Sequence, residues 1–298
     1  MGRHRNDRFC RLRERGYGMR NIVKSFLFIF GMSAADSALS VSQVKEADAP
    51  DDKPFSLSVS TSLSQTPVRA SSAEYTRFYA VGADLSWRLW KTDSLLLKDP
   101  SVSVGLSYSD DPEFEDESSN MGNTSLSFSG TRLELAEGLN LGLGLTAVLP
   151  TNEDDRDYIS YQGSLLLTPT LGYELANGLR IDLSSTINRS FYTYETTKGG
   201  SYNPRASWSP GIAVSYQYEQ ISASAGVSNS RVLLTDGSRL DDTYRASVSL
   251  GWAPSEALGL GLFWQQTDRT FGYNRVRPNI DFKYADKTLL TVSATYTL

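Results

Sequence analysis

The sequence predicts an all-β protein that folds as an antiparallel, up-and-down transmembrane β-barrel of about 12 strands, within a range of about 10 to 14. Three observations predict this fold. Apolar residues occupy every second position over most of the chain after residue 54, which is the strand period because successive side chains point to opposite faces. Several alternating runs extend over 10–17 residues, whereas ordinary strands average about 5–6 and tilted membrane strands need about 9–11. Short and long polar connections also alternate.

Residues 1–40 have the order of a secretory signal peptide, which is basic, then apolar, then small. The apolar run Ser25–Met32 is too short to span a membrane as a helix, because such a helix needs about 20 residues. We expect cleavage after Ala35 or after Ser40, with Met19 as an alternative start of the chain. A disordered basic tail with a buried helix is the other interpretation. The basic residues are Arg3, Arg5, Arg8, Arg11, Arg13, Arg15, Arg20 and Lys24.

Loss of this leader changes the chemistry that the chain can support. Its only His and only Cys are His4 and Cys10, so the mature chain has no imidazole base, thiol nucleophile, disulfide or Cys/His zinc site. Residues 1–40 carry 8 of the 29 Lys and Arg and 3 of the 34 Asp and Glu, which leaves a formal net charge of -10. This acidic balance argues against nucleic acid as a partner. Residues 41–54 form a polar lead-in, and one domain, the barrel, is expected over 55–298.

The strands are expected to follow one another from residue 55 to the end of the chain. The pattern suggests 13 of them, but two termini on one side of the membrane require an even number, so one segment is assigned wrongly. The least secure segments are 55–64 and 268–286. The alternating apolar faces lie at 55–63, 79–89, 102–108, 139–147, 159–175, 179–187, 208–218, 221–227, 246–252, 258–264 and 290–298.

The connections alternate in length in the way that is typical of outer-membrane barrels, with short turns in the periplasm and long loops outside. Asn177-Gly178 is the strongest hairpin signal, because both central residues of a type I′ turn need a positive φ. The other short connections are Glu137-Gly138, Glu219-Gln220, Pro254–Ala257 and Ala285-Asp286. The long ones lie near 66–77, 110–122, 150–157, 195–205, 235–242 and 268–279.

A secreted β-sandwich would also show alternation, and it remains the alternative fold. Two further features favour the membrane. Charge is almost absent from the apolar faces, and a bilayer core penalises a lipid-facing Arg or Lys by about 2–4 kcal/mol. Aromatic residues gather toward strand ends, where amphipathic rings prefer the headgroup level. These are Tyr158, Tyr161, Tyr192, Tyr194, Trp208, Tyr216, Tyr218, Trp252, Tyr284 and Tyr296.

The leader, the alternating hairpins and the terminal strand Leu290–Leu298 resemble Gram-negative outer-membrane β-barrel proteins. The resemblance implies location in the cell outer membrane, contact with the lipid bilayer and lipopolysaccharide, and insertion by the barrel-insertion machinery. In that class the final strand usually ends in Phe or Trp, whereas this chain ends in Tyr296-Thr297-Leu298. The stretch Val148–Asp155 is similar to outer-membrane proteins associated with aromatic-compound degradation, but it is too short to imply a function.

The inward positions are mostly Ser and Gly, which leaves room for water or a narrow solute path; a lumen plugged by a hydroxyl network is the equal alternative. Inward charges have mixed signs, and a salt-bridged network such as Arg180/Asp182 is favoured over a selectivity filter. We hypothesise that Asp84, Arg88 and Arg245 line a constriction. The inward charges are Asp84, Arg88, Arg132, Glu134, Glu174, Arg180, Asp182, Arg245, Asp281 and Lys283.

Catalysis is not expected, because the two enzyme types familiar on such barrels both need a His. The acidic stretch Asp110–Glu117 lacks the spacing of a calcium loop and is interpreted as a solvated outer loop. No cofactor or metal is expected. The leading hypothesis is an outer-membrane channel that passes small hydrophilic solutes by diffusion. The alternative is a non-conducting structural or adhesive barrel that acts through its acidic extracellular loops.

Overall fold

The computed structural model describes residues 54–67, 77–89, 100–110, 119–270 and 287–298. About three quarters of them belong to strands, because β-branched, aromatic and small residues alternate there without a helical period. The one described α-helix, α2 (Glu153–Tyr158), has six residues, and no helix in the described ranges could cross a bilayer. The strands are β1 (Phe55–Gln65), β2 (Arg77–Arg88), β3 (Ser101–Asp110), β4 (Ser119–Met121), β5 (Thr124–Ala136), β6 (Leu139–Leu149), β7 (Tyr161–Glu174), β8 (Leu179–Tyr192), β9 (Pro204–Tyr218), β10 (Ile221–Leu234), β11 (Thr243–Trp252), β12 (Leu258–Arg269) and β13 (Thr288–Thr297).

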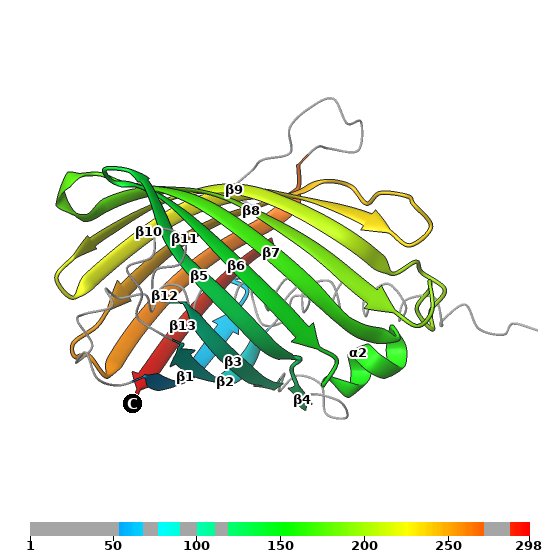
Figure 1. Ribbon diagram of the computed structural model, residues 1–298. Coiled ribbons are helices and arrows are strands. Elements are labelled where there is room, and N and C mark those ends of the chain that lie inside the picture. The colour runs from blue at the N-terminus through cyan, green and yellow to red at the C-terminus, as the bar shows by residue number, and fades with distance from the viewer. Residues whose placement is uncertain (1–53, 68–76, 90–99, 111–118, 271–286) are drawn as a thin grey trace, which may run out of the picture. The chain divides into compact units, whose positions relative to one another are not determined.

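Twelve of these strands form a closed antiparallel barrel. Each pairs with its neighbours in chain order, and β1 pairs with both β2 and β13, which joins the first strand to the last. The three-residue strand β4 pairs only with β3 and lies outside the ring. Figure 1 shows the strands side by side and steeply tilted, as closure of a sheet into a barrel requires. The prediction of a 12-stranded up-and-down barrel is confirmed.

The outer face of the barrel is apolar and exposed. Leu183, Leu250 and Val292 point outward from three different strands, and each is 50–58% exposed. A soluble protein rarely leaves so continuous an apolar surface uncovered. The largest fully buried side chains are Gln266, Asn203 and Pro100, so two sheets do not enclose an apolar core in the described ranges. The sandwich alternative is therefore wrong.

The two ends of the barrel differ. One end holds the start of β1, the end of β13 and the tight turns. Among these turns, Asn177 (φ 68°) and Gly178 (φ 78°) have the positive φ values expected of an Asn-Gly hairpin. The other end holds the longer loops and α2, which lies beyond the ends of β6 and β7 in Figure 1. By the usual orientation, the first end is periplasmic and the second extracellular.

The two segments whose strand assignment was least secure, 55–64 and 268–286, have different outcomes. Residues 55–65 are a full barrel strand. β12 pairs directly with β13, so the ring needs no strand from the chain between them, and residues 271–286, which include the expected turn at 285–286, lie outside the described residues. The leader and lead-in, residues 1–53, also lie outside them. A further connection at the turn end, between β2 and β3, was not anticipated.

The aromatic girdles are confirmed at Trp208, Tyr216 and Trp252, which are exposed on the outer face. Tyr161 and Tyr192 were expected there too, and that expectation is wrong. Tyr161 is only 6% exposed, and its ring packs 5.7 Å from that of Tyr192. A β-bulge between Tyr161 and Gly163 shifts the register by one residue, so the alternation that predicts an outward face reverses at this point.

Candidate functional site

The inner face of the barrel is lined by small hydroxyl side chains. Many of them form hydrogen bonds to hydroxyls on the neighbouring strand, which satisfies part of their bonding capacity and leaves the rest for water. These pairs occur on several sides of the barrel. They are Ser64–Thr291 (2.7 Å), Ser101–Ser129 (2.6 Å), Ser127–Thr146 (3.0 Å), Thr168–Thr186 (3.3 Å), Ser209–Ser230 (3.0 Å) and Ser224–Ser249 (2.6 Å).

Inward glycines add space to this wall. A Cβ placed on Gly259 would meet no atom within 4 Å, and one on Gly142 would meet a single carbonyl oxygen at 3.9 Å. Close packing therefore does not explain why these positions lack a side chain. Barrels of about 8 strands are just filled by side chains, and those of about 16–18 hold an aqueous channel. A 12-stranded wall of Ser, Thr and Gly lies between these cases and favours an open path.

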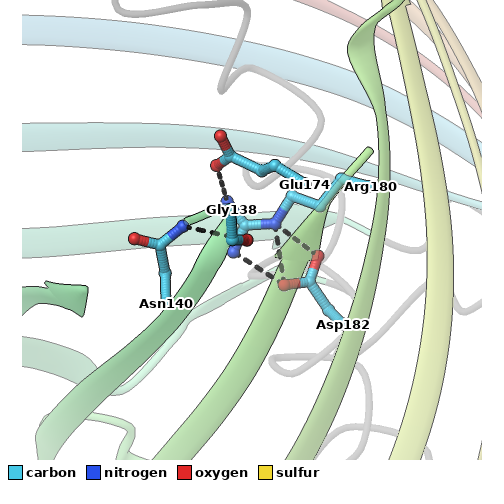
Figure 2. Close-up of polar contacts among 5 residues, drawn as sticks. All are labelled: Gly138, Asn140, Glu174, Arg180 and Asp182. Atoms are coloured by element: carbon cyan, nitrogen blue, oxygen red, sulfur yellow. Dashed lines mark hydrogen bonds and ion pairs between the residues drawn. The ribbon is translucent and has the colours of Figure 1, made fainter. Parts of the chain in front are cut away.

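An ion cluster lies on the inner wall at the periplasmic end of β7 and β8. Arg180 donates from Nε to both carboxylate oxygens of Asp182 (2.8 and 2.9 Å) and from Nη2 to Oδ1 (2.6 Å). Its Nη1 donates to Glu174 Oε1 at 3.2 Å. Figure 2 shows the guanidinium held between the two carboxylates. Several charge-assisted bonds fix this side chain against the wall, so it does not cross the lumen.

A glycine makes room for the cluster. A Cβ on Gly172 would lie 2.5 Å from Arg180 Nη2 and 2.7 Å from Asp182 Oδ1, so any larger residue would displace the ion pair. The cluster confirms the predicted Arg180/Asp182 network, and Glu174 belongs to it as well. The side chain of Arg132 and the residues Asp281 and Lys283 lie outside the described part of the chain.

The three residues of the hypothesised constriction lie on the inner face at different places. Asp84 and Arg88 share β2, where Asp84 is paired with Ser58 and Gly105 and Arg88 lies at the periplasmic end. Arg245 lies near the extracellular end of β11, and β1, β13 and β12 separate the two strands. The fold therefore brings Asp84 and Arg88 onto one strand face and leaves Arg245 apart from them.

The extracellular loops are ordered by amide and carboxylate side chains. Asn123 donates from Nδ2 to Asp155 Oδ2 (2.6 Å) and accepts from the backbone N–H of Asn152 (3.0 Å). Asn152 caps helix α2 by accepting from the N–H of Asp155 (3.0 Å). These bonds hold the loop between β6 and β7 against the start of β5, as pairing of buried polar groups requires. Across the described residues, no group of three or more His, Cys, Asp or Glu side chains could hold a metal ion.

Asn203 joins three extracellular loops. It is fully buried, and its Nδ2 donates to the carbonyls of Ile159 and Tyr194, each at 3.0 Å. Its backbone N–H donates to Glu195 O (2.8 Å), and its carbonyl accepts from the N–H of Thr235 (3.0 Å). Sequence reasoning missed this residue because its partners lie up to 44 positions away. The only local signal is an Asn directly before Pro204 at the start of a strand.

The carboxyl of Asp155 makes the α2 loop sensitive to pH. Burial raises the pKa of Asp155 above its ordinary value of 3.8; the bond from Asn123 opposes this rise, and the neighbouring Asp154 adds to it. A carboxyl whose pKa is higher in the folded loop binds more protons there, so stability is lost as the pH rises through the folded pKa. We expect hydrogen-exchange protection of residues 150–160, corrected for the intrinsic rate, to fall as the pH rises above about 4, the ordinary pKa of an aspartate.

Asp155→Asn is expected to remove this fall, because the amide oxygen can still accept from Asn123 but does not titrate. Asp157→Asn on the same helix is the matched control, since Asp157 is an exposed carboxylate and its replacement should leave the pH dependence in place. A fall that persists in Asp155→Asn would contradict the assignment.

The closed ring, the apolar exterior and the polar interior together define a class of protein. Among β-sheet structures, only a closed barrel, whose backbone groups are all paired between strands, can span the hydrocarbon of a bilayer, and its outer face must be apolar. The protein has the fold of a transmembrane β-barrel.

No protein-family model matches the sequence, and no curated protein matches it. Solved structures do match in fold. An outer membrane channel from Pseudomonas putida F1 is 13% identical, over 82% of this chain and 95% of that one, with a TM-score of 0.56. The NanC porin is 10% identical, over 81% of this chain and 100% of that one, with a TM-score of 0.51. At these identities the likeness shows the fold.

Proposed function

We propose that the protein is an outer-membrane channel that passes small hydrophilic solutes by passive diffusion, without catalysis or a cofactor. The observation that carries the proposal is the inner wall, where paired hydroxyls and glycines line a closed ring of twelve strands. Hydroxyls can exchange hydrogen bonds with water and with a passing solute at little cost. The two structural neighbours are a channel and a porin by name, which supports the same class of function.

The charge pattern supports a weakly selective path. The ion cluster at the periplasmic end neutralises Arg180 within the wall, so no ring of one sign forms there. We propose that Asp84 and Arg88, which share one face of β2, form the constriction, and that Arg245 lines the path separately, near its extracellular end. The proposal includes insertion by the barrel-insertion machinery through β13.

Charge reversal at Asp84 tests the path through the lumen. A unit charge about 4 Å from an ion contributes about 1 kcal/mol even in water, which is a factor of about five in relative permeability. Asp84→Lys is therefore expected to shift the cation-to-anion permeability ratio toward anions by about fivefold or more. Reversal potentials of purified protein in planar bilayers under a salt gradient would measure this shift.

Glu256→Lys is the matched control, since it makes the same charge change in an exposed periplasmic turn and should shift the ratio much less. Equal ratios for Asp84→Lys and the unmodified channel would remove Asp84 from the path. A correctly folded protein that gives no conductance steps would instead favour the non-conducting barrel that acts through its extracellular loops.

A further inference from the structure

Two arginines lie on the lipid-facing side of the barrel near the extracellular ends of β8 and β10. Ile187, Trp208 and Arg231 form one row across β8, β9 and β10. The next row outward contains Arg189, Ala206 and Leu233. Strands lie about 4.8 Å apart and rise about 3.3 Å per residue, so the two arginine backbones are about 12 Å apart. Both share their face with exposed apolar side chains, which is unusual for a cation.

The depth of Arg189 and Arg231 in the membrane can be inferred from the exposed aromatic residues of β9. Tyr216 and Trp208 are both exposed on the outer face and are eight positions apart, which is about 26 Å along the strand. A tilt of about 40° reduces this to about 20 Å across the membrane, close to the height of an apolar band of about 25 Å between two girdles. Trp208 therefore marks the outer girdle, and the arginines lie at or just beyond it, where lipid phosphates begin.

The guanidinium groups of this patch do not use all of their N–H donors in ion pairs. Arg231 Nε and Arg239 Nη2 each lie 3.2 Å from a different oxygen of Asp242, and their side chains are 49% and 59% exposed. The Arg231 guanidinium also lies 5.3 Å from the Trp208 ring, whose indole N–H donates to Ser185. The side chain of Arg189 is exposed on the same face. One aspartate among three arginines leaves a net charge of +2 on this patch.

We propose that Arg189, Arg231 and Arg239 bind the phosphate groups of a lipid of the outer leaflet, namely lipopolysaccharide. Guanidinium groups match phosphate because their N–H donors form a planar fork. Asp242 and Trp208 hold Arg231 in place without consuming all of its donors. Ile187 and Phe191, which are 47% and 44% exposed beside Arg189, offer an apolar surface for acyl chains. A free phosphate would contact only the arginines. A lipid would contact the arginines with its phosphate groups and the apolar side chains with its acyl chains.

The test measures lipopolysaccharide bound to the full protein. We compare the unmodified protein with Arg189→Gln/Arg231→Gln, and use Arg156→Gln as the matched control, since Arg156 is an extracellular arginine paired with Glu153 and Asp157 on α2. Each protein is purified in detergent, its folding is checked by heat-modifiable gel migration, and its affinity is measured for lipopolysaccharide, for dephosphorylated lipopolysaccharide and for inorganic phosphate.

The double variant is expected to bind lipopolysaccharide at least about tenfold more weakly, while Arg156→Gln binds as the unmodified protein does. Dephosphorylated lipopolysaccharide should bind the unmodified protein and the double variant with the same reduced affinity. Equal affinity of the folded double variant and the unmodified protein would overturn the site. Equal affinity for inorganic phosphate and lipopolysaccharide would overturn the assignment to a lipid. Neither result depends on whether the barrel conducts.

Discussion

Replacing Leu183 by arginine is expected to destabilise the folded barrel by about 2–4 kcal/mol. Leu183 points into the lipid and is 50% exposed. It pairs with Ile212, which is midway along β9 between the girdle residues Tyr216 and Trp208. A charge at this depth loses its hydration, and the neighbouring apolar side chains offer no compensation. Reversible denaturant unfolding in lipid or detergent, followed by tryptophan fluorescence, would measure the loss.

Ser184→Arg is the matched control, because it places the same charge on the next residue of the same strand but on the inner face. Its side chain can reach water in the lumen, so we expect a loss of no more than about 1 kcal/mol. The apolar exterior predicts this large asymmetry between adjacent positions. If Ser184→Arg cost as much as Leu183→Arg, the assignment of the two faces would be contradicted.

Replacing Asn203 by leucine is expected to destabilise the extracellular loops by about 2–5 kcal/mol. The substitution keeps the volume but removes the two bonds from Nδ2 to the carbonyls of Ile159 and Tyr194. Each buried carbonyl left unpaired costs about 1–3 kcal/mol. Hydrogen exchange of residues 193–203 and 235–242 would show the loss as faster opening, while the transmembrane strands should exchange as before.

Two further variants make this result specific. Asn203→Asp keeps the shape but has no N–H donor, so it should lose at least as much protection as Asn203→Leu. Asn140→Leu is the control at a half-exposed asparagine, whose Nδ2 makes a longer bond of 3.4 Å to Gly138 O and should contribute less than about 1 kcal/mol. An Asn203→Asp variant that exchanges like the unmodified protein would show that the amide donors do not hold the loops.

The outer face could be predicted from the sequence because the signal is local. Leu183 and Leu250 point to the lipid for the same reason that every second residue of a strand does, and a hydrocarbon solvent accepts little else there. The Asn177-Gly178 turn is local as well, since its two positive φ values depend on only these two residues. The Arg180/Asp182 pair could be predicted because residues two apart on a strand share a face.

The sequence did not predict features that depend on a break in the apolar–polar alternation or on contacts between residues far apart in the chain. The bulge at Gly163, with φ 125°, reverses the faces beyond it, so Tyr161 lies inside although its spacing from Leu165 places it outside. Nothing near Asn203 indicates that it contacts two other loops. The sequence analysis did not single out Arg189, which lies within β8 on the lipid face, beside Ile187 and Phe191.

By itself, the sequence determined the strand period, the polarity of the two faces and the alternation of turns and loops, because each depends on neighbours within a few residues. Only the tertiary structure decided that twelve strands close the ring, that Asn203 joins three loops, and that Arg189 and Arg231 share a patch. These features require residues far apart in the chain to meet, and their positions follow from the register and tilt of the whole barrel, to which every strand contributes.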